Sequence, residues 1–228
     1  MSTLARRTRI KICGLTREQD VDAAVEAGAD AVGFVLYEKS PRHVSAARAA
    51  ELARRLPPFI TPVLLFVNAD AGTVRAACEA IPNALLQFHG DESPADCAAA
   101  ARGRPYLRAA RIPLSDAAGF DLVKFASDFS QAQAILLDAH VDGYGGAGKA
   151  FDWSRIPTSV DAHLVLSGGL TPANVGDGIA LLRPRCKTLA VDVSSGVEAA
   201  KGIKDTGKIH QFVAAVRAAD ERLAGPST

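Results

Sequence analysis

The sequence predicts an α/β protein in which strands and helices alternate along one domain. Short runs rich in Val, Ile and Leu recur at nearly even spacing, and the alanine-rich segments between them have helical periodicity. Such alternation requires a parallel sheet with crossover helices. We place strands near residues 9–14, 31–36, 61–68, 84–90, 106–112, 134–140, 163–169 and 188–195. Eight strands can close on themselves, so we predict a single-domain (β/α)8 TIM barrel.

Length and composition limit the protein classes that need to be considered. The chain of 228 residues suits one barrel, and no linker divides it, so we expect residues 1–228 to form one domain. Lys and Arg number 26 against 25 Asp and Glu, and aromatic residues make up 6%. This balance predicts no nucleic-acid binding and no membrane binding. Without a recognisable signal peptide or transmembrane stretch, we expect a cytoplasmic protein.

The cysteines give no sign of a metal site or of disulfides. Cys13, Cys78, Cys97 and Cys186 lie far apart and include no CxxC spacing, so we expect reduced thiols and no metal. Three of them, Cys78, Cys97 and Cys186, fall in or beside helical segments, where we expect packing roles.

Several helix ends can be predicted from short motifs. Thr16 with Gln19 three residues later fits a capping box, and Gly28 is placed to end the same helix. Thr171 followed by Pro172 is typical of an N-cap and the first helical turn. The last helix has an apolar stripe at helical spacing, made of Ile209, Phe212, Val213 and Val216.

Two strands end on residues suited to acid–base chemistry. Cys13 ends the first strand, immediately before Gly14, and Asp138 ends the apolar run of the sixth. Catalytic groups of barrels come from the C-terminal ends of strands, which favours Cys13 and Asp138 as a base and acid pair. The alternatives are a buried packing role for Cys13, and a helix cap or ion-pair partner role for Asp138.

Other polar residues follow the same strand ends. Arg42 lies in a long loop after the second strand, where it could bind a carboxylate through two hydrogen bonds or simply be solvated. Gln87 and His89 share one side of the fourth strand by parity, and we expect polar contacts from them rather than metal binding. Lys11 has the parity of Cys13 and would need an acidic partner inside the barrel, for which Asp192 is our hypothesis.

Glycine-rich segments follow strands six, seven and eight. Residues 143–150 are spaced like a Walker A loop, but Ala150 replaces the hydroxyl residue that reaches Mg²⁺, so we exclude nucleotide hydrolysis. Backbone N–H groups in such segments can bind a phosphate, although glycines can also simply form tight turns. The predicted phosphate-binding residues are Gly146, Ala147, Gly168, Gly169, Ser194, Ser195 and Gly196.

Taken together, these segments resemble the phosphoribosylanthranilate isomerase family of tryptophan biosynthesis. The resemblance covers nearly the whole chain and includes KICGLT (11–16), LQFHGDE (86–92), LSGGLTPANV (166–175) and VDVSSGVE (191–198). It implies a (β/α)8 barrel that needs no cofactor. The implied reaction is an Amadori rearrangement of N-(5-phosphoribosyl)anthranilate to 1-(2-carboxyphenylamino)-1-deoxyribulose 5-phosphate. By the same resemblance, Cys13 is the general base, Asp138 the general acid, and Arg42 holds the anthranilate carboxylate. The predicted substrate-binding residues are Arg42, Gln87, His89 and Asp192.

The resemblance also sets expectations for residues that differ and for the pH dependence. Ala147 stands where the family usually has Ser or Thr, and Phe88 replaces a usual Leu; neither is the proposed acid or base. Asp138 must donate a proton while Cys13 must be a thiolate, whereas free Asp and Cys titrate near ~3.9 and ~8.5. We expect a nearby cation or a helix N-terminus to lower the pKa of Cys13. A bell-shaped profile should follow, governed by Cys13 on its acidic side and Asp138 on its alkaline side.

Two rival functions remain at this stage. One is the related aminoaldose-phosphate isomerase of histidine biosynthesis, for which we expect two aspartates, so that Cys13 argues against it. The other is a phosphate-ligand-binding barrel without catalysis. In each case the partner is a small phosphorylated molecule, and the sequence leaves monomer and homodimer open.

Overall fold

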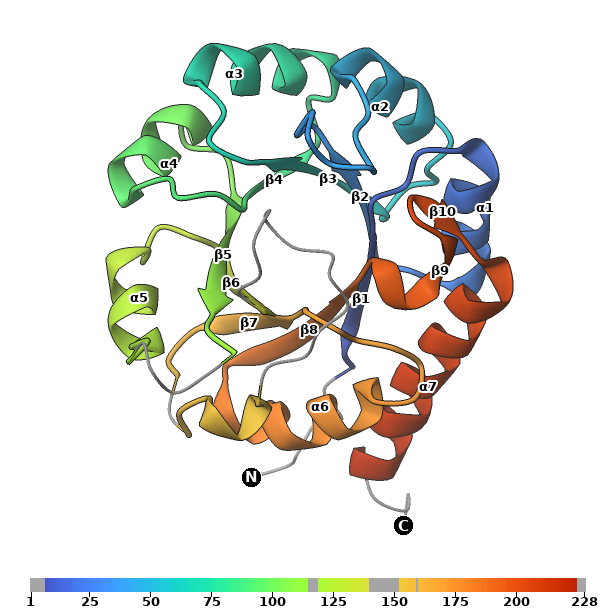
Figure 1. Ribbon diagram of the computed structural model, residues 1–228, viewed down its shortest axis with the longest axis vertical. Helices are drawn as coiled ribbons and strands as arrows, with labels where there is room; N and C mark the ends of the chain where they lie inside the picture. Colours follow the sequence, from blue (N-terminus) through green and yellow to red (C-terminus); the bar gives the residue numbers. More distant parts are fainter. Residues whose placement is uncertain (1–6, 115–118, 140–151, 159, 225–228) are drawn as a thin grey trace.

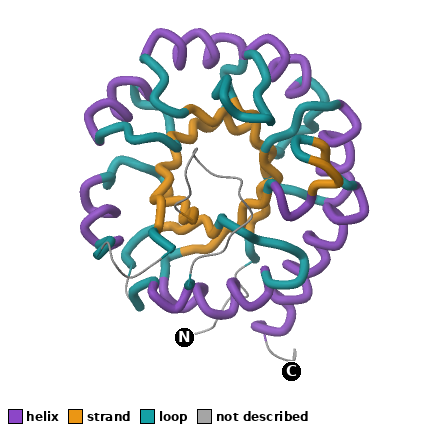
Figure 2. Tube along the Cα trace, in the orientation of Figure 1, coloured by secondary structure: helices purple, strands orange, loops and turns teal. Residues whose placement is uncertain are grey.

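Eight parallel strands close into a barrel in the order of the chain, which confirms the predicted fold. The computed structural model describes residues 7–114, 119–139, 152–158 and 160–224. Helices surround the strands on the outside (Figures 1 and 2). The strands are β1 Arg9–Cys13, β2 Ala31–Val35, β3 Thr61–Phe66, β4 Leu85–Phe88, β5 Tyr106–Ile112, β6 Ala134–Ala139, β7 His163–Leu166 and β8 Thr188–Val193.

Helices connect most of the strands, as the alanine-rich segments predicted. Between β6 and β7, however, the described residues form only a short 3-10 helix, η2 Trp153–Arg155. The α-helices are α1 Glu18–Ala27, α2 Ala46–Ala53, α3 Ala71–Ala80, α4 Pro94–Ala101, α5 Leu122–Asp128, α6 Val175–Leu182 and α7 Thr206–Ala224. Further short elements are the 3-10 helices η3 Arg183–Arg185 and η4 Ser195–Val197, and a hairpin of β9 Glu198–Ala200 and β10 Ile203–Lys204.

Side chains alternate between two apolar layers along each strand. Ile10 and Ile12 of β1 point outward into the large core between the barrel and its helices. The alternate residues point into the barrel, where a smaller apolar cluster fills the interior. That interior cluster contains Leu107, Ala109, Ala134, Leu136 and Val165. Lys11, Cys13 and Asp138 have this inward parity and follow the apolar layer toward the C-terminal ends of the strands.

Two of the predicted helix starts are wrong, and tertiary contacts explain both. The N-cap of α1 is Arg17, without a side-chain cap, because the Thr16 hydroxyl instead donates to the Gly202 carbonyl at 3.2 Å. The helix after β7 begins at Val175, because the Asn174 side chain accepts the Thr171 N–H and holds the preceding residues in a turn. The left-handed Gly28 at the end of α1 and the buried stripe of α7 are confirmed.

All four cysteines are free thiols, and Cys78 and Cys97 are buried in the core while Cys186 packs against it. Among the described residues, none of the helices has both the length and the apolar character needed to cross a bilayer.

A buried ion pair fixes the loops that follow β3 and β4. Glu92 accepts the backbone N–H groups of Asn68 and Gly90 at 2.7 and 2.9 Å, and lies 3.1 Å from Arg108 Nη1. Arg108 also donates to the backbone carbonyls of Phe88, Gly90 and Glu92. Because buried charges are costly unless paired, this pair holds the segment that carries His89 in one conformation.

We predict that Glu92→Gln lowers the free energy of unfolding by about 3–5 kcal/mol, because it leaves the buried Arg108 charge without its counterion. Denaturant unfolding measures this change. The control is Asp91→Asn. Asp91 forms an ion pair with Arg111, but its side chain is 66% exposed, so we expect the free energy of unfolding to fall by less than about 1 kcal/mol. Equal losses in the two variants would contradict the role assigned to Glu92.

Candidate active site

Cys13 shares the barrel mouth with a buried ion pair between β1 and β8. Lys11 Nζ lies 2.7 Å from Asp192 Oδ1, and the Ser167 hydroxyl donates to the other carboxylate oxygen at 3.2 Å. Lys11, Cys13 and Asp192 are each no more than 5% exposed. The expected pairing of Lys11 with Asp192 is therefore confirmed. Both oxygens of Asp192 are engaged by protein groups.

The surroundings of Cys13 act on its pKa in opposite directions. Burial raises the pKa of the thiol, Lys11 and Lys204 lower it in part, and Asp192 raises it again. The neighbouring cations therefore act on the thiol in the expected direction, but burial outweighs them and the net change in the pKa of Cys13 is upward. For Lys11, burial lowers the pKa, but Asp192 and Cys13 together outweigh burial and raise it. Lys11 is accordingly a permanent cation beside the thiol.

A glycine makes room for the Cys13 side chain. Gly33 of β2 is the register partner of Cys13, and a Cβ at Gly33 would lie only 2.7 Å from Cys13 Sγ. Any larger residue would displace the thiol. Gly33 was not among the predicted site residues, although a glycine inside an apolar strand is a recognised sign of close approach.

Gln87, His89 and Asp138 form a chain of contacts that ends at Asp138. Gln87 lies on β4, His89 in the loop that follows β4, and Asp138 on β6. His89 Nε2 and Asp138 Oδ2 are 3.0 Å apart, and the Gln87 amide nitrogen lies 3.0 Å from His89 Nδ1. Since the amide donates, Nδ1 accepts, and Nε2 carries the hydrogen that is donated to Asp138. The backbone N–H of Ala139 binds the other oxygen, Asp138 Oδ1, at 2.9 Å. The carboxyl of Asp138 is therefore held at both oxygens and serves no helix as a cap.

The loops after β7 and β8 meet beside Asp138. Gly168 has φ +75°, and a Cβ there would lie 2.8 Å from Asp138 Oδ1, so this position requires glycine. A Cβ at Gly196 would lie 1.8 Å from the Leu170 carbonyl oxygen, which shows that the two loops touch. Gly169 belongs to the first loop, and Ser194 and Ser195 to the second. The other two predicted phosphate-binding residues, Gly146 and Ala147, lie outside the described residues.

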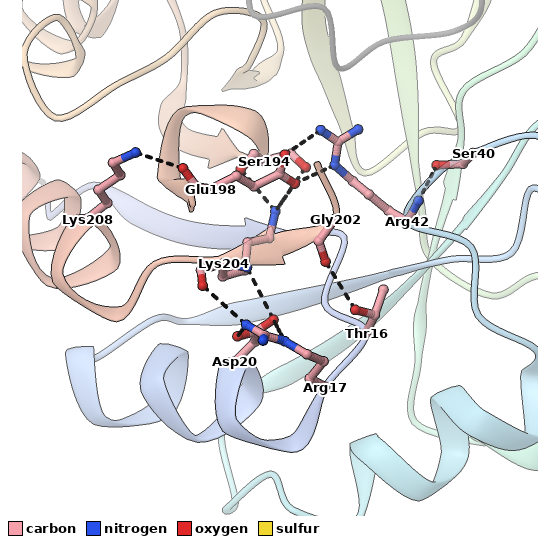
Figure 3. A network of polar contacts seen from close by, with 10 residues as sticks. All are labelled: Thr16, Arg17, Asp20, Ser40, Arg42, Ser194, Glu198, Gly202, Lys204 and Lys208. Carbon is pink, nitrogen blue, oxygen red and sulfur yellow. Dashed lines mark hydrogen bonds and ion pairs between the residues drawn. The ribbon is translucent and has the colours of Figure 1, made fainter. Parts of the chain in front are cut away.

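Arg42 is buried rather than solvated, and its partner comes from the hairpin that follows β8. Nε and Nη2 lie 2.6 and 2.8 Å from the two carboxylate oxygens of Glu198 (Figure 3). Lys204 Nζ lies 3.0 Å from Glu198 and donates to the Ser194 carbonyl at 2.9 Å. Glu198 and Lys204 were not among the predicted site residues, because a three-residue and a two-residue strand give no measurable periodicity.

The chain is similar to known proteins along nearly its whole length. The family model of N-(5'-phosphoribosyl)anthranilate (PRA) isomerase matches residues 10–215. The N-(5'-phosphoribosyl)anthranilate isomerase of Methylibium petroleiphilum is 66% identical over 218 residues, covering 96% of this chain and 98% of the relative. That of Leptothrix cholodnii is also 66% identical, over 95% of this chain and 94% of the relative.

Solved structures show the same relationship. The crystal structure of phosphoribosyl anthranilate isomerase from Thermotoga maritima aligns with a TM-score of 0.81 and 38% identity, over 92% of this chain and 99% of that one. A phosphoribosyl anthranilate isomerase in complex with reduced 1-(o-carboxyphenylamino)-1-deoxyribulose 5-phosphate aligns with a TM-score of 0.78 and 36% identity, over the same shares. The chain belongs to the phosphoribosylanthranilate isomerase family of enzymes.

Proposed function

We propose that this protein converts N-(5-phosphoribosyl)anthranilate to 1-(2-carboxyphenylamino)-1-deoxyribulose 5-phosphate in tryptophan biosynthesis. The observation that carries the proposal is the pair of inward side chains, Cys13 on β1 and Asp138 on β6, at the C-terminal ends of barrel strands in a member of this family. A thiol and a carboxyl are the two proton-transfer groups that an aldose-to-ketose rearrangement needs.

In the proposed mechanism Asp138 is the general acid. It donates a proton to the ribose ring oxygen, the bond from that oxygen to the anomeric carbon breaks, and the anthranilate nitrogen forms a Schiff base. The hydrogen bonds from His89 and from the Ala139 N–H hold the carboxyl in one orientation. Gln87 fixes the tautomer of His89, so Gln87 and His89 act through Asp138.

Cys13 is the proposed general base. Its thiolate removes the proton from the sugar carbon next to the Schiff base, and the resulting enolamine tautomerises to the aminoketone. Lys11 stabilises the thiolate, and Asp192 keeps Lys11 in place with a bond of 2.7 Å. Asp192, which we expected to contact substrate, is therefore proposed to act through Lys11.

The two ends of the substrate carry charges that the site is built to bind. We assign the phosphate to Gly168, Gly169, Ser194, Ser195 and Gly196 in the two touching loops, with Gly146 and Ala147 as predicted contributors. The anthranilate carboxylate is assigned to Arg42. The thiol at position 13 continues to disfavour the histidine-pathway substrate, and a non-catalytic barrel would not need it.

We predict rapid turnover of freshly prepared phosphoribosylanthranilate by the wild type, measured by loss of its fluorescence. Cys13→Ser and Asp138→Asn should each lower kcat by roughly 10²–10⁴-fold, because each removes one proton-transfer group. Circular dichroism verifies that both variants are folded. If the wild type is inactive, or if both variants retain full activity, the proposed function is wrong.

A second prediction concerns the thiol in the free protein. Lys11→Met removes a neighbouring cation and should raise the pKa of Cys13, whereas Asp192→Asn removes an anion and should lower it. The pH dependence of alkylation at Cys13, followed by peptide mass spectrometry, measures both. Shifts in the same direction in both variants would contradict the electrostatic account.

The pH profile of kcat/KM provides a third test. The sequence predicts that Cys13 sets the acidic limb of the profile, which requires the pKa of the Cys13 thiol to be lower than that of the Asp138 carboxyl. Burial raises the pKa of Cys13 and so opposes this requirement. If the pKa of the general base is the higher of the two, the alkaline limb gives the pKa of the base. We therefore expect the alkaline limb to follow Cys13 and to move to higher pH in Lys11→Met; an unmoved limb would exclude this assignment.

A further inference from the structure

Glu198 binds only one edge of the Arg42 guanidinium. Its two oxygens accept from Nε at 2.6 Å and from Nη2 at 2.8 Å. A guanidinium has five N–H groups, so three remain, two on Nη1 and one on Nη2. The remaining Nη2 hydrogen and one Nη1 hydrogen form the edge next to the one that Glu198 binds, and no described residue accepts a hydrogen bond from Nη1. An arginine held in this way presents a second two-pronged edge for another carboxylate.

The charges of this cluster favour an anion. Burial raises the pKa of Glu198, but Arg42 and Lys204 outweigh burial and lower it, so Glu198 is a carboxylate. Lys204 Nζ is fully buried, 3.0 Å from that carboxylate. Arg42, Lys204 and Glu198 thus combine two positive charges with one negative charge. The uncompensated positive charge in a buried setting attracts a negatively charged group on the substrate.

The hairpin that carries Glu198 and Lys204 is fixed to its surroundings along its length (Figure 3). The Gly202 carbonyl accepts from the Thr16 hydroxyl at 3.2 Å, and the Lys204 carbonyl accepts from Arg17 Nη2 at 3.2 Å. Gly202, with φ +81°, lies against the Pro41 carbonyl, where a Cβ would be 2.8 Å away. The hairpin therefore contacts both the start of α1 and the residue preceding Arg42.

We propose that Glu198 is a positioning residue that aims the free edge of Arg42 at the carboxylate of the substrate, with Lys204 as the counterion that keeps Glu198 charged. This inference rests on the proposed function, which supplies the carboxylate. Glu198 thereby determines selectivity for a ring that carries a carboxylate, although it does not itself touch the substrate. A purely structural ion pair would stabilise the fold without changing this selectivity.

The test compares two probes on the full chain: reduced 1-(o-carboxyphenylamino)-1-deoxyribulose 5-phosphate, and the same compound without the carboxyl group. We expect the wild type to bind the first at least roughly tenfold more tightly, as for a hydrogen-bonded charge pair. Glu198→Gln keeps the shape of the side chain but loses its charge. It should weaken binding of the first probe roughly tenfold and of the second less than about threefold. Titration calorimetry measures both affinities.

A matched control separates positioning from stability. Asp220 is a largely buried carboxylate bonded to Arg183 and to Thr8, and it lies outside the site. Asp220→Asn should lower the unfolding temperature and leave the ratio of the two affinities at its wild-type value. If Glu198→Gln does not fold, Glu198→Asp is used in its place. Aspartate keeps the negative charge on a side chain that is one methylene shorter. The ratio of the two affinities should then lie between that of the wild type and that of Arg42→Met.

Several outcomes would overturn the inference. One is an equal loss for both probes in Glu198→Gln, another is no loss for either, and a third is a wild type that does not distinguish the probes. Turnover of phosphoribosylanthranilate by the wild type is measured alongside. If turnover is present and the ratio is unchanged in Glu198→Gln, only the inference fails; if turnover is absent, the proposed function itself fails.

Discussion

The site depends on one constraint, which is that charges taken into the barrel mouth must be paired. Lys11 with Asp192, and Arg42 and Lys204 with Glu198, are ion pairs whose side chains are all less than 9% exposed. An unpaired charge at such depth costs several kcal/mol, so each pair fixes the rotamers of both partners. The proposed proton transfers need a rigid geometry, because misplacement of a reacting group slows the reaction. Ion pairing therefore fixes the side-chain positions in this site, while the apolar layers below the site stabilise the fold.

The barrel could be predicted because its signals are local and repeated. Eight apolar runs, strand parity and the inward position of Lys11 required no knowledge of distant contacts, and the pairing with Asp192 followed from the cost of burying a lone ammonium. The start of α1 could not be predicted in the same way. Thr16 fits a capping box by sequence, but its hydroxyl bonds to Gly202, which lies 186 residues later. Local propensity fails where a distant partner competes for the same group.

The candidate site shows the same division between local and distant information. Strand ends identified Cys13 and Asp138, since position along a strand fixes the end of the barrel that a residue occupies. The partner of Arg42 was missed because Glu198 is 156 residues away, on a hairpin too short to show periodicity. The direction of the Cys13 pKa was missed for another reason. Strand parity is enough to predict a cation near the thiol. Whether that cation or burial has the larger effect on the pKa of Cys13 depends on the packing around the thiol.

Lys204 touches two parts of the mouth that serve different ends of the proposed substrate. Its ammonium bonds to the Ser194 carbonyl, beside the proposed phosphate loop, and to Glu198, behind Arg42. The proposed phosphate-binding loop and Arg42, the proposed carboxylate-binding residue, are thus held through the same lysine. This shared contact keeps the two proposed anion sites at a fixed distance from each other. A ligand with the right two charges but a longer or shorter sugar would satisfy one end only.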